Sequence, residues 1–198
     1  MAETKFILHG GFTRVVNEQN NSFFRELVAN VTQPKILLCF FAVAEQDRVP
    51  ELFSELSRRI VELNADKKIE CELATQENFI SQLKATNVLY MHGGNTEQLL
   101  KVLERFPTFT VDIAGKVVAG SSAGAYALVH KGAAHTSEHS RTGLDLIPIR
   151  LIVHSDSPEF PPNENSVKEL LASDIEYELV KLKDCEWRAF EIDDTCCC

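Results

Sequence analysis

A serine between two glycines is the part of this 198-residue sequence whose residue types and spacing most directly suggest chemistry. In the segment GSSAG, Gly120 lies two residues before Ser122 and Gly124 lies two residues after it. This spacing fits the G-x-S-x-G pattern, in which the serine lies on a sharp turn between a strand and a helix and exposes its hydroxyl. Ser121 is the alternative serine, but only Ser122 has glycine at both offsets. We predict Ser122 as a nucleophile, and the alternative is a tight turn with a purely structural role.

A serine nucleophile requires a base, and histidine serves most often. The sequence has six histidines. His154 ends the apolar run RLIV, so it is expected at the carboxyl end of a strand, on the same edge as Ser122. His9 and His92 precede glycine pairs at this expected edge. We predict His154 as the base.

A third residue, a carboxylate, is expected to orient the imidazole of the base. The candidates are Asp156, Glu138, Asp145, Asp184 and Glu186. Asp184 lies in KDCE between the last two expected strands, where a solvated carboxylate is the simpler interpretation. The residues alone do not choose among the five.

Backbone N–H groups near Ser122 are expected to bind the oxyanion that forms during acyl transfer. Ala123 follows the serine at the N-terminus of the expected helix, where the helix dipole adds positive potential. The segment HGGNT adds Gly93 and Gly94, whose N–H groups can point at a substrate carbonyl, and Asn95, which can cap the next helix. Without the serine turn, HGGNT would indicate only a junction between a strand and a helix.

Strands and helices must position these residues, and apolar runs alternate with helical patterns along the whole chain. Strands are expected at residues 5–8, 35–42, 69–73, 87–91, 116–120 and 150–154. Helices are expected at residues 21–31, 50–64, 77–85, 96–106, 124–130 and 166–173. Two last strands, 177–183 and 187–193, are expected to form a C-terminal β-hairpin. This alternation predicts an α/β fold with a mostly parallel sheet and helices on both faces.

Ligands of such sheets bind beyond the carboxyl ends of the strands. Three glycine-bearing turns follow expected strands, at residues 9–11, 92–95 and 120–124. We therefore expect all three turns to open on the same edge of the sheet.

Composition limits the class of protein and its partners. With 44% hydrophobic and 25% charged residues, the chain is predicted to form a single serine-hydrolase domain over residues 1–195, followed by a disordered cysteine tail at 196–198. A net charge of -9 argues against nucleic acid or an anionic membrane as a partner. No targeting segment, membrane-spanning run or metal-ligand spacing is visible in the sequence, so we expect a cytoplasmic protein with no metal and no cofactor.

Taken together, the motifs resemble those of one family. GSSAGA resembles the serine turn of the peptidase E (aspartyl dipeptidase) and cyanophycinase family, and the strand followed by GGNT resembles that family's GGGNT element. The segment GLDLIPIRLIVH, 143–154, resembles its G-L-x-L-[IL]-P…H segment, which carries the base. LKDCEW resembles its final turn, which carries a glutamate. The similarity runs from residue 87 to residue 192.

The resemblance implies a flavodoxin-like three-layer sandwich of the class I glutamine amidotransferase type, and serine hydrolysis of peptide bonds that involve aspartate. Carried across, Ser122 is the nucleophile, His154 the base, and Asp184 the acid in place of the family's glutamate. The order Ser, His, acid along the chain differs from that of α/β-hydrolases. We expect Asp-X dipeptides as substrates. Arg141 and Arg150 are candidates for binding the aspartyl carboxylate, and the alternative is that both are surface arginines.

Other functions stay open on the same fold. One is a non-catalytic small-molecule binding or sensor module that keeps the turn without a triad, and another is an esterase that uses the same site. A Ser122 hydroxyl out of reach of His154 would favour the binding module. The partner we expect is a small peptide substrate and, as one option, a second copy of the chain in a homodimer.

Overall fold

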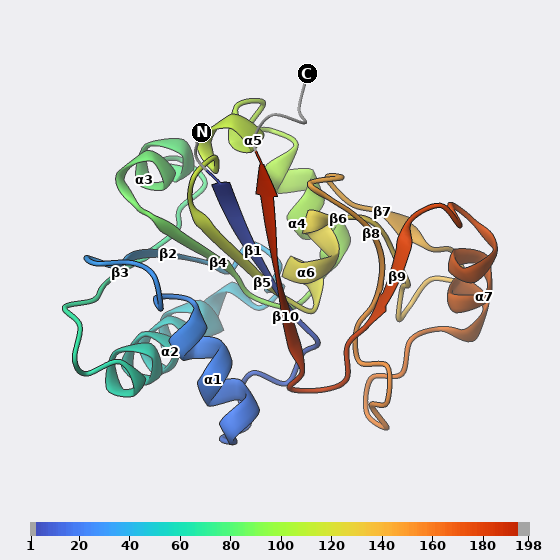
Figure 1. The fold of residues 1–198 in the computed structure, drawn as a ribbon, viewed down its shortest axis with the longest axis horizontal. Coiled ribbons are helices and arrows are strands. Elements are labelled where there is room, and N and C mark those ends of the chain that lie inside the picture. The colour runs from blue at the N-terminus through green and yellow to red at the C-terminus, as the bar shows by residue number, and fades with distance from the viewer. Residues whose placement is uncertain (1–2, 194–198) are drawn as a thin grey trace.

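A six-stranded sheet lies at the centre of the structure, a computed structural model that describes residues 3–193 (Figure 1). Its strands, in spatial order, are β10 (Trp187–Asp193), β1 (Glu3–His9), β5 (Val117–Ser121), β4 (Val88–Met91), β2 (Lys35–Cys39) and β3 (Glu70–Leu73). Neighbouring strands are parallel except β10 and β1. The α/β fold with a mostly parallel sheet is therefore confirmed, and the cysteine tail predicted at 196–198 lies outside the described residues.

Successive residues of the strands face two different helical layers. One face packs against α1 (Glu18–Glu26) and α2 (Val49–Leu63), through side chains that include Ile7, Leu38, Tyr90 and Ala119. The other face packs against α3 (Phe79–Ala85), α4 (Thr96–Leu103) and α5 (Phe109–Asp112), through side chains that include Leu8, Leu37, Leu89 and Val118. Burial on both faces explains why these strands are continuous apolar runs in the sequence.

A second sheet of four strands stands beside the main sheet (Figure 1). Its strands, in spatial order, are β7 (Arg141–Thr142), β6 (Val129–Gly132), β8 (Ile147–Ile152) and β9 (Glu178–Lys181). The helix α6 (Ala123–Leu128) contacts strands of both sheets, and all six of its residues are buried. A helix that is apolar on every side is stable only inside a core. It therefore joins the two sheets, and one cluster of buried side chains contains residues from both sheets.

The expected C-terminal β-hairpin is not formed. β9 pairs in parallel with β8 in the second sheet, whereas β10 pairs antiparallel with β1 in the main sheet. The connection between them bonds to other strand ends: the carbonyl of Leu182 accepts the N–H of Ser155 at 3.1 Å, and the carbonyl of Glu186 accepts the N–H of Gly10 at 2.8 Å. These bonds hold the two ends of the connection against different sheets, so the strands diverge.

The second sheet also corrects the expected elements between residues 123 and 154. The helix after Ser122 ends at Leu128, and β6 starts at the next residue, inside the helix expected at 124–130. β5 already has β1 and β4 as neighbours, so β6 has no place beside it in the main sheet. The chain therefore starts a new sheet, which β8 and then β9 extend.

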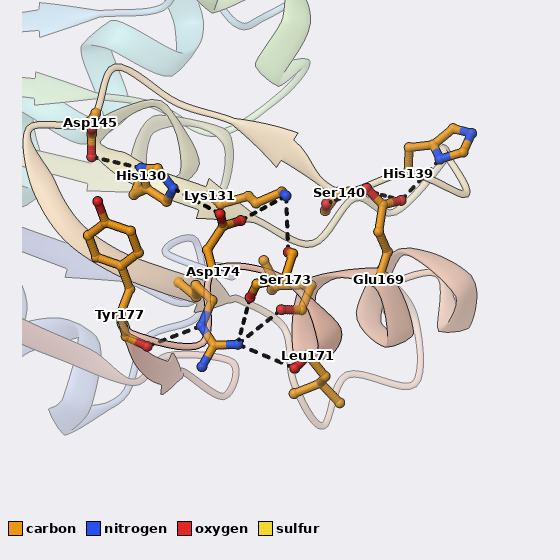
Figure 2. A network of polar contacts seen from close by, with 12 residues as sticks. His130, Lys131, His139, Ser140, Asp145, Glu169, Leu171, Ser173, Asp174 and Tyr177 are labelled. Carbon is orange, nitrogen blue, oxygen red and sulfur yellow. Dashed lines mark hydrogen bonds and ion pairs between the residues drawn. The ribbon is translucent and has the colours of Figure 1, made fainter.

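Polar contacts fasten α7 (Glu164–Ala172) to the second sheet (Figure 2). Lys131 on β6 donates to Asp174 Oδ2 at 2.9 Å and to Ser173 Oγ at 3.0 Å. At the other end of this contact, Ser140 Oγ donates to Glu169 Oε1 at 2.9 Å. The second half of α7 and the two residues that follow it are thus anchored to the second sheet.

Helix ends follow the expected local rules. Asn95 begins α4 as predicted, because its Oδ1 accepts the N–H of Gln98 at 3.1 Å. Pro50 lies in the first turn of α2, where its missing N–H costs no hydrogen bond. α1 starts earlier than expected because Asn17 caps it, accepting the N–H of Asn20 at 2.8 Å. Of the helices within residues 3–193, none is long and apolar enough to cross a membrane.

Candidate active site

The candidate site lies where the carboxyl ends of strands from both sheets meet. The three glycine-bearing turns follow β1, β4 and β5, which are adjacent in the main sheet and parallel. They open on one edge, as expected. His154 follows β8 and Asp184 follows β9, which are adjacent and parallel in the second sheet. His154 was expected on the same edge as Ser122, and it arrives there from a different sheet.

Ser122 lies on the sharp turn between β5 and α6. Its backbone has φ 50° and ψ −106°, a conformation that a residue with a side chain adopts at a cost of about 1–3 kcal/mol. A Cβ on Gly120 would come within 2.3 Å of the Gly124 carbonyl group, so the two glycines do meet across the turn. Ser121 is 3% exposed, whereas Ser122 is partly exposed. Of the two serines, Ser122 is the one that a substrate can reach.

The imidazole of His154 lies between the serine hydroxyl and a carboxylate. Its Nε2 is 3.0 Å from Ser122 Oγ, and its Nδ1 is 2.5 Å from Asp184 Oδ1. An ionised carboxylate can only accept, so Nδ1 carries the proton and Nε2 is left to accept the serine O–H. This is the arrangement that lets a histidine remove a proton from a serine.

The other candidate carboxylates are engaged elsewhere or exposed. Asp156 Oδ1 accepts the backbone N–H of Asp184 at 3.2 Å, so it supports the turn that carries Asp184. Asp145 is 3.0 Å from His130, and Glu186 accepts the N–H of Lys183 at 2.8 Å. Glu138 is exposed between β6 and β7. Of the five carboxylates considered, Asp184 is the one bonded to His154.

Two turns bring backbone close to the serine. Ala123 is the first residue of α6, so its N–H has no partner within the helix. Gly93 lies against the serine, since a Cβ placed on it would be 3.3 Å from Ser122 Cβ. His92 Nδ1 lies 2.8 Å from the Gly93 carbonyl, which can only accept, and it thereby orients the peptide between Gly93 and Gly94. Burial lowers the pKa of His92, so this imidazole is neutral. Asn95 serves as the cap of α4.

Residues that the sequence did not indicate surround His154, which is 6% exposed. A Cβ on Gly11 would lie 1.9 Å from His154 Cε1, so the backbone of that turn rests on the imidazole. The rings of Phe12, His135 and Phe160 lie at centroid distances of 5.7, 5.2 and 6.0 Å from the imidazole. In the sequence, the pair Gly10 and Gly11 after β1 is the feature that could have indicated a close approach between this turn and another residue.

Of the two arginines considered for substrate binding, Arg150 is excluded. Its guanidinium is buried and donates to backbone carbonyls, those of Tyr177 at 3.1 Å, Leu170 at 3.1 Å and Ser173 at 3.0 Å. It therefore holds the C-terminus of α7. Arg141 is partly exposed and lies 3.8 Å from Glu97, beside a surface cavity of about 440 Å³. Within residues 3–193, no group of three or more His, Cys, Asp or Glu side chains is arranged to hold a metal ion.

The sequence was compared with protein families and curated proteins, and the fold was compared with solved structures. The sequence model of peptidase family S51 matches residues 6–195. A comparison with curated proteins finds no match. The structure of a peptidase from an acI-B1 Actinobacterium superposes with a TM-score of 0.71 at 21% identity, over 98% of this chain and 86% of that chain. A protein described as a candidate peptidase E from Listeria monocytogenes EGD-e superposes with a TM-score of 0.65 at 18% identity, over 96% of this chain and 98% of that chain. Both structures share the fold of this chain.

Proposed function

The chain belongs to peptidase family S51, a family of serine peptidases, and from this premise we propose that it hydrolyses small peptides with Ser122 as nucleophile, His154 as base and Asp184 as orienting acid. The observation that carries the proposal is the continuous hydrogen-bonded chain from Ser122 Oγ through the imidazole to Asp184 Oδ1, with distances of 3.0 and 2.5 Å. A binding module without catalysis would not require this alignment or the strained backbone of Ser122.

The proposed reaction proceeds in two halves. Ser122 Oγ attacks the peptide carbonyl carbon while its proton passes to His154 Nε2. The N–H groups of Ala123 and Gly93 stabilise the oxyanion. His154 then gives the proton to the leaving amine, the C–N bond breaks, and an acyl-enzyme forms. Water attacks the ester carbonyl, His154 takes its proton and returns one to Ser122 Oγ, and the carboxylic acid product leaves. Asp184 keeps its hydrogen bond to Nδ1 throughout and stabilises the imidazolium.

Asp-X dipeptides are the proposed substrates. The resemblance to aspartyl dipeptidases supports this choice. The aspartyl side chain requires a cation. Because Arg150 is committed to α7, Arg141 is the arginine that remains from the sequence-based candidates.

A serine-reactive probe tests the proposal whatever peptide the enzyme cleaves. We expect a fluorophosphonate to label Ser122, identified by mass mapping, and Ser122→Ala to abolish labelling and lower turnover by several orders of magnitude. Ser54→Ala, which removes an exposed serine on α2, is the control and should keep both. Labelling at another residue, or full activity of Ser122→Ala, would contradict the proposal. A panel of Asp-X, Glu-X and Ala-X dipeptides beside small esters then decides the substrate class and separates a peptidase from an esterase.

A further inference from the structure

A buried polar pair lies directly beneath the candidate site. His9, the last residue of β1, and Asn20, on α1, are both 0% exposed. His9 Nε2 is 2.8 Å from Asn20 Oδ1, and His9 Nδ1 accepts the backbone N–H of Gly11 at 3.0 Å. Since a backbone N–H only donates, the neutral imidazole carries its proton on Nε2 and donates it to the amide oxygen. Both ring nitrogens are therefore satisfied, each by a different partner.

The pair holds the loop that follows β1 from both sides. Asn20 Nδ2 donates to the carbonyl of Phe12 at 2.9 Å and to that of Val15 at 2.7 Å. His9 binds the N–H of Gly11 on the same loop. Phe12 has a positive φ of 58°, which a non-glycine residue keeps only where surrounding contacts enforce it. The side chains of His9 and Asn20 supply those contacts.

His9 and the loop that follows it touch the segments that carry all three triad residues. The carbonyl of His9 accepts the N–H of Ser122 at 3.0 Å, and the carbonyl of Gly10 accepts the N–H of His154 at 3.1 Å. The carbonyl of Gly11 accepts the N–H of Cys185, the residue after Asp184, at 3.0 Å. A shift of the loop would therefore move the nucleophile, the base and the acid relative to one another.

We propose that His9 and Asn20 are positioning residues of this hydrolase, which hold the loop at residues 10–15 so that Ser122, His154 and Asp184 stay aligned. The inference rests on the proposed function. Apolar side chains could fill the volume of His9 and Asn20 without needing any hydrogen bond. Burying an imidazole and an amide is unfavourable unless their polar atoms are hydrogen-bonded. Here those bonds go to the backbone that supports the site, which is the place where alignment affects the reaction rate.

The protonation state of His9 is consistent with this role. Burial lowers its pKa to about 4, and the nearby Arg59 guanidinium acts in the same direction. The Asn20 side chain opposes them, and the ring of Phe23 lies at a centroid distance of 4.5 Å. A neutral His9 keeps Nδ1 free to accept the N–H of Gly11, which a protonated imidazole could not do.

Two conservative variants separate the two bonds of His9. In His9→Asn the side-chain Oδ1 replaces Nδ1 as the acceptor for Gly11, whereas in His9→Gln the amide replaces Nε2 and the bond to Gly11 is lost. We expect the rate of fluorophosphonate labelling, and kcat, to fall about a hundredfold in His9→Gln and His9→Phe, with KM nearly unchanged and His9→Asn much closer to wild type. In Asn20→Asp, loss of the two N–H donors to the loop should lower the rate in the same way.

Asn64→Leu is the matched control. Asn64 is a buried amide that donates to the carbonyls of Ile60 and Phe24, away from the site, so its loss should lower the melting temperature and leave labelling unchanged. The low-field proton resonance of the bond between His154 and Asp184 gives a second readout, which should weaken or shift in His9→Gln and not in Asn64→Leu.

The possible outcomes distinguish the proposed function from the positioning role of His9 and Asn20. No labelling of the wild type rejects the proposed function, and this inference with it. If the wild type is labelled, and folded His9→Asn and His9→Gln are labelled at the same rate as the wild type, the positioning role is overturned and the proposed function stands. If His9→Phe fails to fold, the ratio between the Asn and Gln variants still decides. The positioning role is also overturned if the labelling rate falls in proportion to the melting temperature across all variants, including Asn64→Leu.

Discussion

Asp184 reaches the imidazole although its side chain is one methylene shorter than glutamate, because the turn that carries it is held close to His154. The carbonyl of Leu182 accepts the N–H of Ser155, and Asp156 accepts the N–H of Asp184 at 3.2 Å. The first bond involves Leu182, two residues before Asp184, and the second involves Asp184 itself. Both connect to residues just after His154. The reach that the side chain lacks is supplied by the backbone.

Replacing Asp184 by asparagine tests this at the level of one atom. The amide can donate to Nδ1, which favours the imidazole tautomer with its proton on Nε2, where it cannot accept from Ser122. We expect kcat to fall by about 10³–10⁴ with little change in melting temperature. Asp156→Asn keeps an oxygen that accepts the same backbone N–H, so it should lose far less activity. Retention of more than a tenth of kcat by Asp184→Asn would remove Asp184 from its proposed role.

Gly11 is a second residue where adding a single side-chain atom should change the activity. A Cβ there would lie 1.9 Å from His154 Cε1, and its φ of 116° is unfavourable for a side chain. We expect Gly11→Ala to displace the imidazole and lower kcat at least about a hundredfold, with a loss of about 1–3 kcal/mol of stability. Gly115→Ala, at φ 72° and away from the site, is the control. It should lower stability through backbone strain and leave kcat unchanged. Equal kcat values for the two variants would show that the contact between Gly11 and His154 does not affect the reaction.

At the scale of elements, the site depends on α6 as a spacer between two sheets. The helix starts at Ala123, next to the nucleophile, and four residues after Ser122 the hydroxyl of Tyr126 accepts the N–H of Val153 at 3.1 Å. That N–H belongs to the residue before His154. One short helix thus fixes both the serine and the approach to the base.

Tyr126→Phe removes this link while keeping the ring. The N–H of Val153 would stay buried without a partner, which costs about 1–3 kcal/mol. We expect a corresponding fall in the free energy of unfolding, and a loss of kcat smaller than that of Gly11→Ala. Tyr177→Phe, whose ring stacks on His130 at a centroid distance of 4.2 Å, is the control for hydroxyl removal. An unchanged unfolding free energy in Tyr126→Phe would show that this bond contributes nothing.

The sequence predicted these elements unevenly, for a physical reason. The strand before Ser122, the helix after it and the strand before His154 follow from local patterns, because burial and turn chemistry act within a few residues. Which strands pair does not follow from such patterns. β9 and β10 were expected to pair with each other, and the guanidinium of Arg150 was considered for substrate rather than for α7. Both depend on contacts between segments far apart in the chain.

For the molecule as a whole, stability should depend on pH through buried histidines. Burial lowers the pKa of His9 from 6.5 to about 4, and it lowers those of His92 and His135 as well. Between these values the unfolded chain binds protons that the folded chain does not, so stability falls as the pH drops from 6.5 toward 4 and is fully present above 6.5.

Urea unfolding at pH 7.5 and pH 5 measures this dependence. His9 alone should account for about 2 kcal/mol of the loss at pH 5. His9→Asn, which does not titrate in this range, should therefore show a difference between the two pH values that is smaller by about that amount. The same difference in both proteins would mean that His9 is accessible to protons in the folded state.

The pairing of β10 with β1 has a consequence for synthesis on the ribosome. β1 is made long before β10, so one of its two neighbours is not available until residues 187–193 have emerged. The nascent chain already contains Ser122 and His154 while Asp184 and the strand that anchors its turn are still missing. Since contacts so distant in sequence are slow to form, we expect the proposed triad to become aligned only after this strand has emerged. The polypeptide made before it would then meet no aligned triad.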